Sequence, residues 1–290
     1  MELLYSPLHD ICFNSEGARN MINGIYLSTM GALVQAERHA TIANNLANVN
    51  TDGFKPDWVR VRAIPSESDN PVWNPTIRFN IDKVLSKTGG GAWLSPTVSN
   101  LREGAYKVTG NPLDLALQNE PTSGKTSFFM VHPAGSPAGT VRYTRSGHFV
   151  QAEDGIVRDP SGNTLLSTDG TPINLGDAPQ GSIITIHPDG QITAYFDGVN
   201  VGLGQVGIRR TADAAQMKKQ GDGLFDPQDA EMEVYQNGLE QHTLEHSATS
   251  AIMEMVNMIE AQRVYDMNMR FISVQDESLG QSVRRISATA

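Results

Sequence analysis

The fold of this chain is decided by one stretch, Ile42-Ala43-Asn44-Asn45-Leu46-Ala47-Asn48-Val49-Asn50-Thr51-Asp52-Gly53-Phe54-Lys55, because a helix has to end inside it. Asn, Thr, Asp and Gly dominate its second half, and these residues form turns and stop helices. The Asn side chains can cap the helix end, Gly53 permits a backbone angle that other residues avoid, and Phe54 can anchor the outgoing chain. The stretch therefore predicts the exit of a helix into a turn.

A helix over residues 22–47 is predicted by apolar and small residues that recur at three- and four-residue steps. The stripe consists of Ile22, Ile25, Tyr26, Thr29, Leu33, Ala36, Ala40, Ala43 and Ala47. Ile42 and Leu46 lie off this stripe, so the helix carries apolar surface on more than one side and is expected to have more than one packing partner. The helix and its exit form a predicted N-terminal segment, residues 21–60.

Residues 1–20 show no clean periodicity and are predicted to be a disordered extension that does not pack on the rest of the chain. The organised pattern begins behind Met21, so Met21 is a second candidate for the biological start besides Met1. The extension has three acidic residues and no basic residue before Arg19. A secretory signal needs a basic start and an apolar core, so we expect that any export uses a route that does not read such a signal.

The middle of the chain is predicted to contain a connector and a β domain. Residues 61–104 are expected to be a loop-rich connector, because residues 64–100 are rich in Pro, Ser, Asn and Gly. Residues 105–238 contain short β-prone runs separated by turn-forming pairs, a spacing typical of a sandwich or barrel-like β domain. The pairs are Ser146-Gly147, Asp154-Gly155, Ser161-Gly162, Asp169-Gly170, Asp189-Gly190 and Asp197-Gly198.

A second helical segment is predicted over residues 239–290, with a Pro-free helix at 240–285. Its main stripe is Ile252, Met255, Val256, Ile259, Met267, Phe271 and Val274, whereas Met253, Met258, Val264 and Met269 lie off it. Such a helix would be roughly 65 Å long, more than a compact core of this size needs. The predicted fold class is α+β: adjacent, antiparallel N- and C-terminal helices form a coiled-coil stalk, and the central domain is all-β.

The composition argues against nucleic acid and the membrane interior as binding partners. The formal net charge of −10 disfavours binding to nucleic acid, and no basic cluster reverses this locally. The single cysteine, Cys12, cannot form an intrachain disulfide or a Cys-rich metal site. No apolar run is long enough to span a bilayer. We therefore expect no nucleic-acid partner and no direct membrane insertion.

Two glycine motifs resemble nucleotide-binding loops but lack the required context. Residues 202–207 match G-x-G-x-x-G, yet they lie among predicted hairpins and no helical pattern follows. Gly124-Lys125-Thr126 resembles the end of a P-loop, but Asn119 stands where that loop needs a glycine, and a strand-like run follows. Both stretches are predicted to be turns or loops.

A third motif, His242-Thr243-Leu244-Glu245-His246, matches the zinc peptidase pattern H-x-x-E-H. On a helix the two imidazoles would share a face, so zinc ligation is geometrically possible. Two polar residues at a solvated helix start explain the pair as well. A zinc hydrolase using His242 and His246 stays open as an alternative, as does a binding module whose β domain holds a ligand. Otherwise we expect no catalytic residue, cofactor or metal.

Four stretches resemble the bacterial flagellar rod and hook proteins. Residues 42–55 resemble the N-terminal signature of that family, and residues 254–265 its C-terminal helix. Residues 109–117 and 143–149 are similar to its entry into the β domain and to the hairpin that follows. Residues 24–32 and 62–65 are most like the proximal rod protein, with the distal rod and hook proteins as alternatives. The chain departs from the family pattern in an insertion at residues 121–127 and in residues 246–250.

The resemblance implies a structural subunit of the flagellar basal body rod and no enzyme. Such subunits are exported unfolded by the flagellar type III export apparatus without a cleaved signal peptide, and they join other rod subunits. Their terminal helices polymerise into a helical tube that crosses the periplasm as a drive shaft for flagellar motility. The assembly interface is expected to include Asn44, Asn45, Leu46, Asn48, Gly53, Phe54, Met255, Val256, Met258, Ile259, Gln262 and Tyr265.

Overall fold

The computed structural model describes residues 8–63, 91–120, 123–137, 139–179, 181–213 and 216–289, with side chains from Gly24 onward except at positions 286 and 289. The chain divides into two compact units. The helical unit comprises residues 1–43, 58–97 and 254–290, and the β unit comprises residues 44–57 and 98–253. Each unit is therefore assembled from segments that lie far apart in the sequence.

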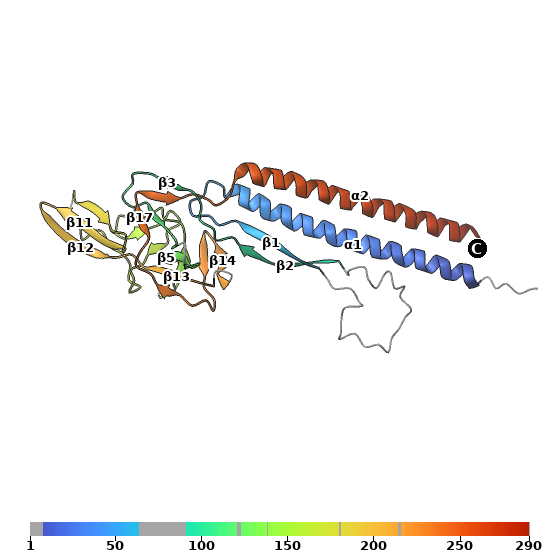
Figure 1. Cartoon of the computed structure of the whole chain (residues 1–290), viewed down its shortest axis with the longest axis horizontal. Coiled ribbons are helices and arrows are strands. Elements are labelled where there is room, and N and C mark those ends of the chain that lie inside the picture. The colour runs from blue at the N-terminus through green and yellow to red at the C-terminus, as the bar shows by residue number, and fades with distance from the viewer. Residues whose placement is uncertain are drawn as a thin grey trace, which may run out of the picture. The chain divides into compact units, whose positions relative to one another are not determined.

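The helical unit is built on two long helices, α1 (Leu8–Ala47) and α2 (Ala251–Thr289), which lie side by side (Figure 1). They are antiparallel, because Gly24 of α1 lies against Gln275 of α2 and Gly31 lies against Asn268. Strand β1 (Asp57–Ala63) pairs with β2 (Ala92–Ser99) in a two-stranded sheet. No described helix is both long and apolar enough to cross a membrane.

The first helix differs from its prediction at its start. It begins at Leu8, so residues 8–20, which were expected to be disordered, are helical. No proline interrupts the sequence between Pro7 and Pro56, and a helix does not require an apolar stripe along its whole length. Residues 1–7 and the side chains before Gly24 lie outside the described residues. The expectation that residues 1–20 do not pack on the rest of the chain therefore stays a prediction.

Two other boundaries also differ from the predictions. The expected connector, residues 61–104, contains all of β2 and the end of β1, whereas residues 64–90 lie outside the described part of the chain. The C-terminal helix begins at Ala251 instead of residue 240. The intervening residues form two short strands that pair with strands of the β unit, and this long-range pairing was not visible in the local pattern.

The β unit contains sixteen of the described strands, and every strand pair in it is antiparallel. The strands are β3 (Tyr106–Val108), β4 (Leu115–Leu117), β5 (Thr126–His132), β6 (Arg142–Thr144), β7 (Val150–Gln151), β8 (Val157–Arg158), β9 (Thr164–Leu165), β10 (Ile183–Ile186), β11 (Gln191–Phe196), β12 (Val199–Gln205), β13 (Ile208–Thr211), β14 (Lys218–Gly221), β15 (Leu224–Asp226), β16 (Glu233–Val234), β17 (Leu239–Gln241) and β18 (Thr243–Glu245).

The largest sheet runs in the order β14-β15-β6-β5-β9-β8-β7, and β13 joins it by pairing with β5 and β16. Strands β10, β11 and β12 form a separate meander, β17 pairs with β4, and β18 pairs with β3. The core is apolar and includes Phe129 and Phe149, whose rings meet edge to face at 5.4 Å between centroids. The helix–β–helix order confirms the predicted α+β class.

The predicted turns connect strands as expected in the meander. Gly190 lies between β10 and β11 with a φ of 87°, and Gly198 lies between β11 and β12 with a φ of 84°. Positive φ values of this kind are what hairpin turns require of their residues, and glycine adopts them without steric cost. The sequence pairs therefore predicted these two hairpins correctly.

The three motif matches also have a place in the fold. Residues 202–207 lie in β12 and in the link to β13, and Gly124-Lys125-Thr126 leads into β5. The premise of the zinc alternative was wrong, because His242 and His246 are not on a helix. His242 lies between β17 and β18 with a φ of 63°, and His246 follows β18. The two imidazoles are therefore not one helical turn apart.

Candidate functional site

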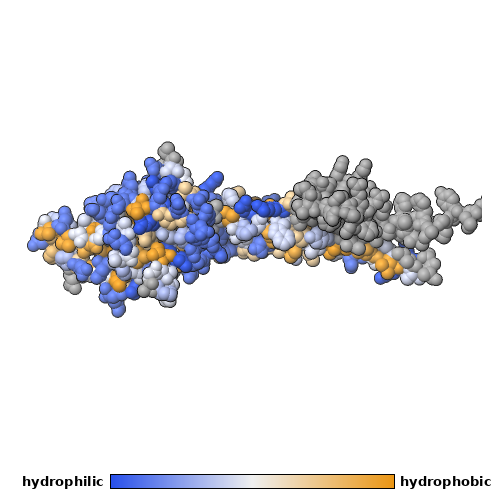
Figure 2. All heavy atoms as spheres, turned by 90° about the horizontal axis from the view of Figure 1, so that it is seen from below, coloured by the Kyte–Doolittle hydropathy of each residue, from blue (hydrophilic) through white to orange (hydrophobic). Residues whose placement is uncertain are grey.

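The apolar stripe of α2 lies on the surface of the subunit. We call this set the outer stripe, and it consists of Ile252, Met255, Val256, Ile259, Met267, Phe271 and Val274. The exposed fraction of these side chains runs from 49% at Met255 to 74% at Ile252. Hydrophobic residues are visible on the surface of the helical unit in Figure 2. A helix normally buries its apolar face against other parts of the protein, whereas the outer stripe is an apolar face that stays exposed to solvent.

The face of α2 that meets α1 is composed differently. Asn268 and Gln275 contact glycines of α1, and Ala261, seven residues before Asn268, is only 1% exposed. On α1, Ala32 and Val34 are buried, whereas Tyr26 and Leu33 are 52% and 54% exposed. The paired side therefore combines small and amide residues with buried or half-buried apolar residues, whereas Tyr26 and Leu33 of α1 and the outer stripe of α2 stay exposed.

The remaining predicted interface residues of α2 are Met258, Gln262 and Tyr265, which lie off the outer stripe. Met258 and Tyr265 are half-buried, and Gln262 is exposed, where its amide donates to the carboxylate of Asp266 at 3.0 Å. These three side chains retain surface that another copy could contact, but most of the exposed apolar surface of α2 belongs to the outer stripe. The expected α2 residues therefore comprise three exposed apolar residues, the exposed polar Gln262, and the half-buried Met258 and Tyr265.

The signature residues at the end of α1 and in the turn that follows it also comprise exposed and buried positions. Asn44 is exposed, and Leu46 and Asn48 are half-buried. Asn45 is buried at 2% exposure, and its side chain both donates to the Asp57 carbonyl and accepts from the Asp57 N–H, each at 3.0 Å. These two hydrogen bonds tie the end of the helix to the chain that leaves the turn. Asn45 therefore acts inside the subunit.

Gly53 is buried where two backbone segments pass each other. Its φ is 69°, and a Cβ at this position would lie 2.5 Å from the carbonyl carbon and oxygen of Arg145. Its N–H donates to the Glu245 carbonyl at 2.7 Å. Backbone atoms cannot move aside as a flexible side chain can, so both the angle and the space require glycine.

We expect Gly53→Ala to lower the free energy of unfolding of the β unit by about 1–3 kcal/mol, because it combines a left-handed backbone with a steric clash. The matched control is Gly202→Ala in β12, where φ is not positive and an added Cβ would meet nothing within 4 Å. Chemical denaturation of both variants would measure the difference. Equal stability of the two variants would contradict the role given to Gly53.

Phe54 anchors the outgoing chain, as its position in the turn predicted. Its side chain is 7% exposed, and the ammonium of Lys219 in β14 lies 3.9 Å from the centre of its ring. The same ammonium donates to the Lys55 carbonyl at 2.9 Å and contacts the Asp57 carboxylate at 3.2 Å. Lys219 therefore clamps three residues of the turn at once.

Lys219→Met keeps most of the aliphatic stem and removes the charge, and we expect it to cost about 1–2 kcal/mol of stability through the lost hydrogen bonds and cation–π contact. Lys218→Met is the matched control, because Lys218 is the exposed neighbour on the same strand. Thermal unfolding of the two variants would separate the effect of the clamp from that of one lost charge. A Lys219→Met protein as stable as the control would contradict the clamp.

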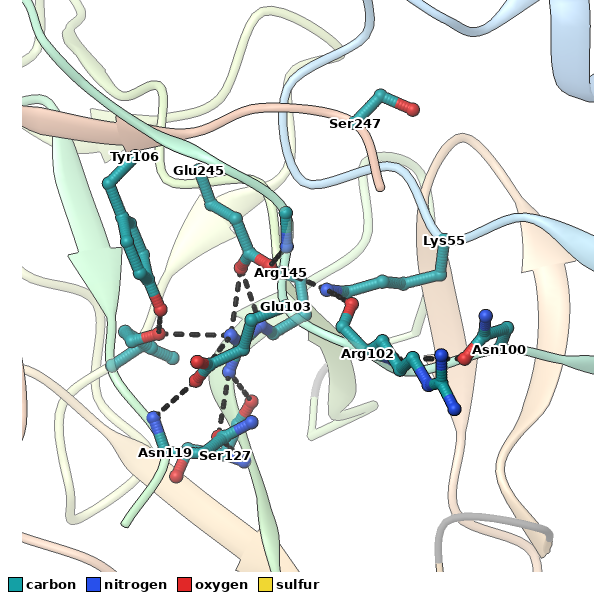
Figure 3. Close-up of polar contacts among 12 residues, drawn as sticks. Lys55, Asn100, Arg102, Glu103, Tyr106, Asn119, Ser127, Arg145, Glu245 and Ser247 are labelled. Carbon is teal, nitrogen blue, oxygen red and sulfur yellow. Dashed lines mark hydrogen bonds and ion pairs between the residues drawn. The ribbon is translucent and has the colours of Figure 1, made fainter. Parts of the chain in front are cut away.

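A buried ion cluster lies directly behind the turn (Figure 3). The ammonium of Lys55 contacts the Glu245 carboxylate at 2.5 Å and donates to the Arg102 carbonyl at 2.6 Å. The second oxygen of Glu245 accepts from the guanidinium of Arg145 at 2.8–2.9 Å. The side chains of Lys55 and Arg145 are 0% exposed and that of Glu245 is 1% exposed. One carboxylate therefore joins two cations with no access to solvent.

The cluster satisfies its hydrogen-bonding groups from several segments. Arg145 also donates to the carbonyls of Leu117 and Ser127 at 2.9 and 2.7 Å and to the side chain of Asn119 at 3.1 Å. The N–H of Gly104 donates to Glu245 at 2.8 Å. Buried charges are tolerated when they are paired and hydrogen-bonded, as these are. The cluster therefore holds the signature turn, the central strands and β18 together.

The titration behaviour of the cluster follows from its burial. Burial lowers the pKa of Lys55, and the carboxylate of Glu245 works in the opposite direction by stabilising the ammonium. Burial, followed by the nearby Glu103 carboxylate, raises the pKa of Tyr106, so its hydroxyl stays protonated and donates to the Leu117 carbonyl at 3.1 Å. The cluster is arranged for cohesion, because the ammonium of Lys55, the guanidinium of Arg145 and the carboxylate of Glu245 are all engaged in structural contacts.

Sequence reasoning did not assign roles to Lys55, Arg145, Glu245 and Lys219. The first three stood inside motifs that were recognised: Lys55 ends the signature, Arg145 lies in residues 143–149, and Glu245 is the acidic residue of the H-x-x-E-H match. The signal in the sequence that could have identified these three residues is a charged side chain inside a motif that is expected to be buried. In the described part of the chain, no three His, Cys, Asp or Glu residues group as metal ligands would.

Comparisons with known proteins identify what the chain is similar to. Residues 27–55 match the family model described as flagella basal body rod protein, and residues 240–285 match the flagellar basal body rod FlgEFG protein C-terminal model. Residues 124–194 match the D1 domain of flagellar hook protein FlgE/F/G. The first of these matches ends at Lys55, and the second contains Glu245 and the outer stripe.

Whole-length relatives agree with these matches. The chain is 28% identical to the flagellar basal-body rod protein FlgG of Borreliella burgdorferi, with 90% of this chain and 97% of the relative covered. It is 28% identical to the flagellar basal-body rod protein FlgF of Escherichia coli, with 92% and 99% covered. It is also 27% identical to the flagellar hook-basal body complex protein FlhO of Bacillus subtilis, with 92% and 99% covered.

Proposed function

This chain is a member of the flagellar basal body rod protein family and a structural rod subunit, and from that premise we propose that it polymerises through its two terminal helices. The observation that carries the proposal is the outer stripe, seven apolar side chains that the subunit leaves exposed. A contiguous apolar surface of this kind marks a protein–protein interface. In the assembled rod, neighbouring copies would cover it.

The exposed residues of α1 supply a complementary surface. Tyr26 and Leu33 are half-exposed on the outside of α1, so each subunit presents apolar groups on both helices. A contact between α2 of one copy and α1 of the next is heterologous, and heterologous contacts that do not close into a ring generate helical filaments. We propose that such contacts, packed as coiled coils, form the tube that crosses the periplasm and transmits torque.

The signature residues contribute to the same assembly from inside the subunit. Asn45, Gly53 and Phe54 are buried and fix how the chain leaves α1, so their part in the interface is indirect. Asn44, Leu46 and Asn48 retain exposed surface and are the signature residues that a neighbour can reach. This division separates residues that shape the subunit from residues that touch the next one.

We further propose a position in the proximal rod, supported by the resemblance of residues 24–32 and 62–65, and export by the flagellum's own apparatus. Other rod and hook components would be its partners.

In cells that lack the distal rod protein, a proximal subunit would still be found in the basal body, whereas a distal one would be missing. Mass spectrometry of the incorporated chain would show whether a leader had been removed, and the proposal expects none.

The proposal as a whole is tested by the composition of isolated basal bodies. A tagged copy of the chain, expressed in place of its chromosomal gene, should co-purify with basal bodies in multiple copies and be located in the rod by electron microscopy. An untagged strain controls for adventitious capture. Basal bodies with complete rods that do not contain the chain would contradict the proposal.

A further inference from the structure

Two contacts in the seam between α1 and α2 place a glycine of α1 against an amide side chain of α2. The Nε2 of Gln275 lies 2.4 Å from the position that a Cβ of Gly24 would take, and the side-chain amide of Asn268 lies 3.2 Å from the position of a Cβ on Gly31. In the described part of the chain, the Oε1 of Gln275 is buried without a hydrogen-bond partner. The two amide groups therefore pack closely on the glycines, and an added Cβ at either glycine would require the amide to move.

The two contacts specify the same alignment of the helices. From Gly24 to Gly31 the chain advances seven residues along α1, and from Gln275 to Asn268 it goes back seven residues along α2. Residues seven apart lie on nearly the same face of a helix, so the contacts are successive layers of one antiparallel seam.

We propose that Gly24 with Gln275 and Gly31 with Asn268 fix the register of α1 against α2. Polar residues in a helix seam are known to select one register at a cost in stability, and the unpartnered oxygen of Gln275 is such a cost. The register decides where Tyr26 and Leu33 stand relative to the outer stripe. It therefore sets the surface that the next copy meets, and this consequence rests on the proposed function.

If α1 shifted along α2 by seven residues in either direction, one of the two glycine–amide layers would be replaced by a mismatched pair. If Gly31 moved opposite Gln275, Asn268 would stand opposite Arg38, and two large side chains would compete for one layer. If Gly24 moved opposite Asn268, Gly31 would stand opposite Ala261, and neither residue could fill the space between the helices. Both mismatches are of the kind that destabilise a packed interface, overpacking in one case and a void in the other.

The test uses cysteine pairs that leave the four seam residues unchanged. In a Cys12→Ser background, Leu27→Cys with Ile272→Cys reports the proposed register. Val34→Cys with Ile272→Cys and Leu27→Cys with Tyr265→Cys report the two slipped registers. Disulfide formation is measured in the purified full chain and in isolated basal bodies. The in-register pair should exceed each slipped pair by about ten to one or more.

The same pairs are then measured with Asn268→Ala and Gln275→Ala together. We expect the slipped disulfides to rise to within about threefold of the in-register one, because the amide groups that pack on the two glycines are gone. Restoration of size complementarity by Gly31→Asn with Asn268→Gly should recover the preference that Gly31→Asn alone abolishes. A ratio unchanged by the double alanine variant, or the absence of the in-register disulfide from both samples, would overturn the proposal. Failure of the chain to enter basal bodies would instead contradict the proposed function, because the purified chain reports register by itself.

Discussion

Glu245→Gln is expected to lower the free energy of unfolding of the β unit by about 3–5 kcal/mol, the range measured when one partner of a buried ion pair is removed. Lys55 and Arg145 are both inaccessible to solvent and share this single carboxylate. The other carboxylate near them, that of Glu103, is 3.7 Å from Arg145 and 32% exposed, so it cannot replace Glu245. Two buried cations would be left with one partly exposed counter-charge, at 3.7 Å from Arg145.

The geometry of the amide adds to this cost. A glutamine has one accepting oxygen, whereas Glu245 accepts from Lys55 through one oxygen and from Arg145 through the other. Whichever way the amide turns, its NH₂ group faces a cation. Since Glu245 raises the pKa of Lys55, its loss also favours the neutral amine, which relieves part of the penalty and leaves Arg145 charged.

The matched control is Glu240→Gln, because Glu240 is an exposed acid in the neighbouring strand β17, and its carboxylate accepts one hydrogen bond from the side chain of Gln118. We expect Glu240→Gln to remain within about 0.5 kcal/mol of the parent protein. Hydrogen exchange of the β5 amides reports opening of the core and would measure both variants. If the two variants exchange at the same rate, the cluster does not stabilise the β unit.

The second large effect is expected for Ile259→Asp, which should abolish rod assembly and motility while the β unit stays folded. Ile259 is 54% exposed in the middle of the outer stripe, so the change costs little in the isolated subunit. In the rod it would place an unpaired carboxylate in an apolar contact, and an unpaired buried charge is among the most costly substitutions known. Every subunit would carry the same defect.

The control for this prediction is Asp189→Asn, at the turn between β10 and β11. Asp189 accepts from the Gln191 N–H through its side-chain oxygen, and asparagine can make the same hydrogen bond. Cells with this variant should swim. Motility on soft agar and electron microscopy of basal bodies would measure both variants. Ile259→Asp cells that swim with intact rods would show that this helix face is not an assembly surface.

The sequence predicted helices, hairpins and family signature well because these features are local. Three- and four-residue periodicity located most of both helices, and Asp-Gly pairs located the turns at Gly190 and Gly198. The strands at β1 and β18 were missed because their identity depends on pairing with β2 and β3, each far away in the sequence. Local composition cannot report a distant partner.

The candidate site was only partly accessible for the same reason. The stripe of α2 was found by periodicity, but periodicity does not say whether an apolar face meets the same chain or another one. Only the structure shows that all seven residues of the outer stripe are exposed. The ion cluster joins Lys55 to a residue 190 positions away, and one sequence carries no signal for such a contact.

The most direct test of assembly through the helices is the accessibility of Ile259 before and after incorporation into the rod. In a Cys12→Ser background, Ile259→Cys is labelled with a maleimide in the purified chain and in isolated basal bodies, with Asp189→Cys as the control on a β turn. We predict rapid labelling of Ile259→Cys in the purified chain and strong protection in basal bodies, with Asp189→Cys labelled in both. Equal labelling of Ile259→Cys in the two samples would contradict the central claim that the outer stripe joins one subunit to the next.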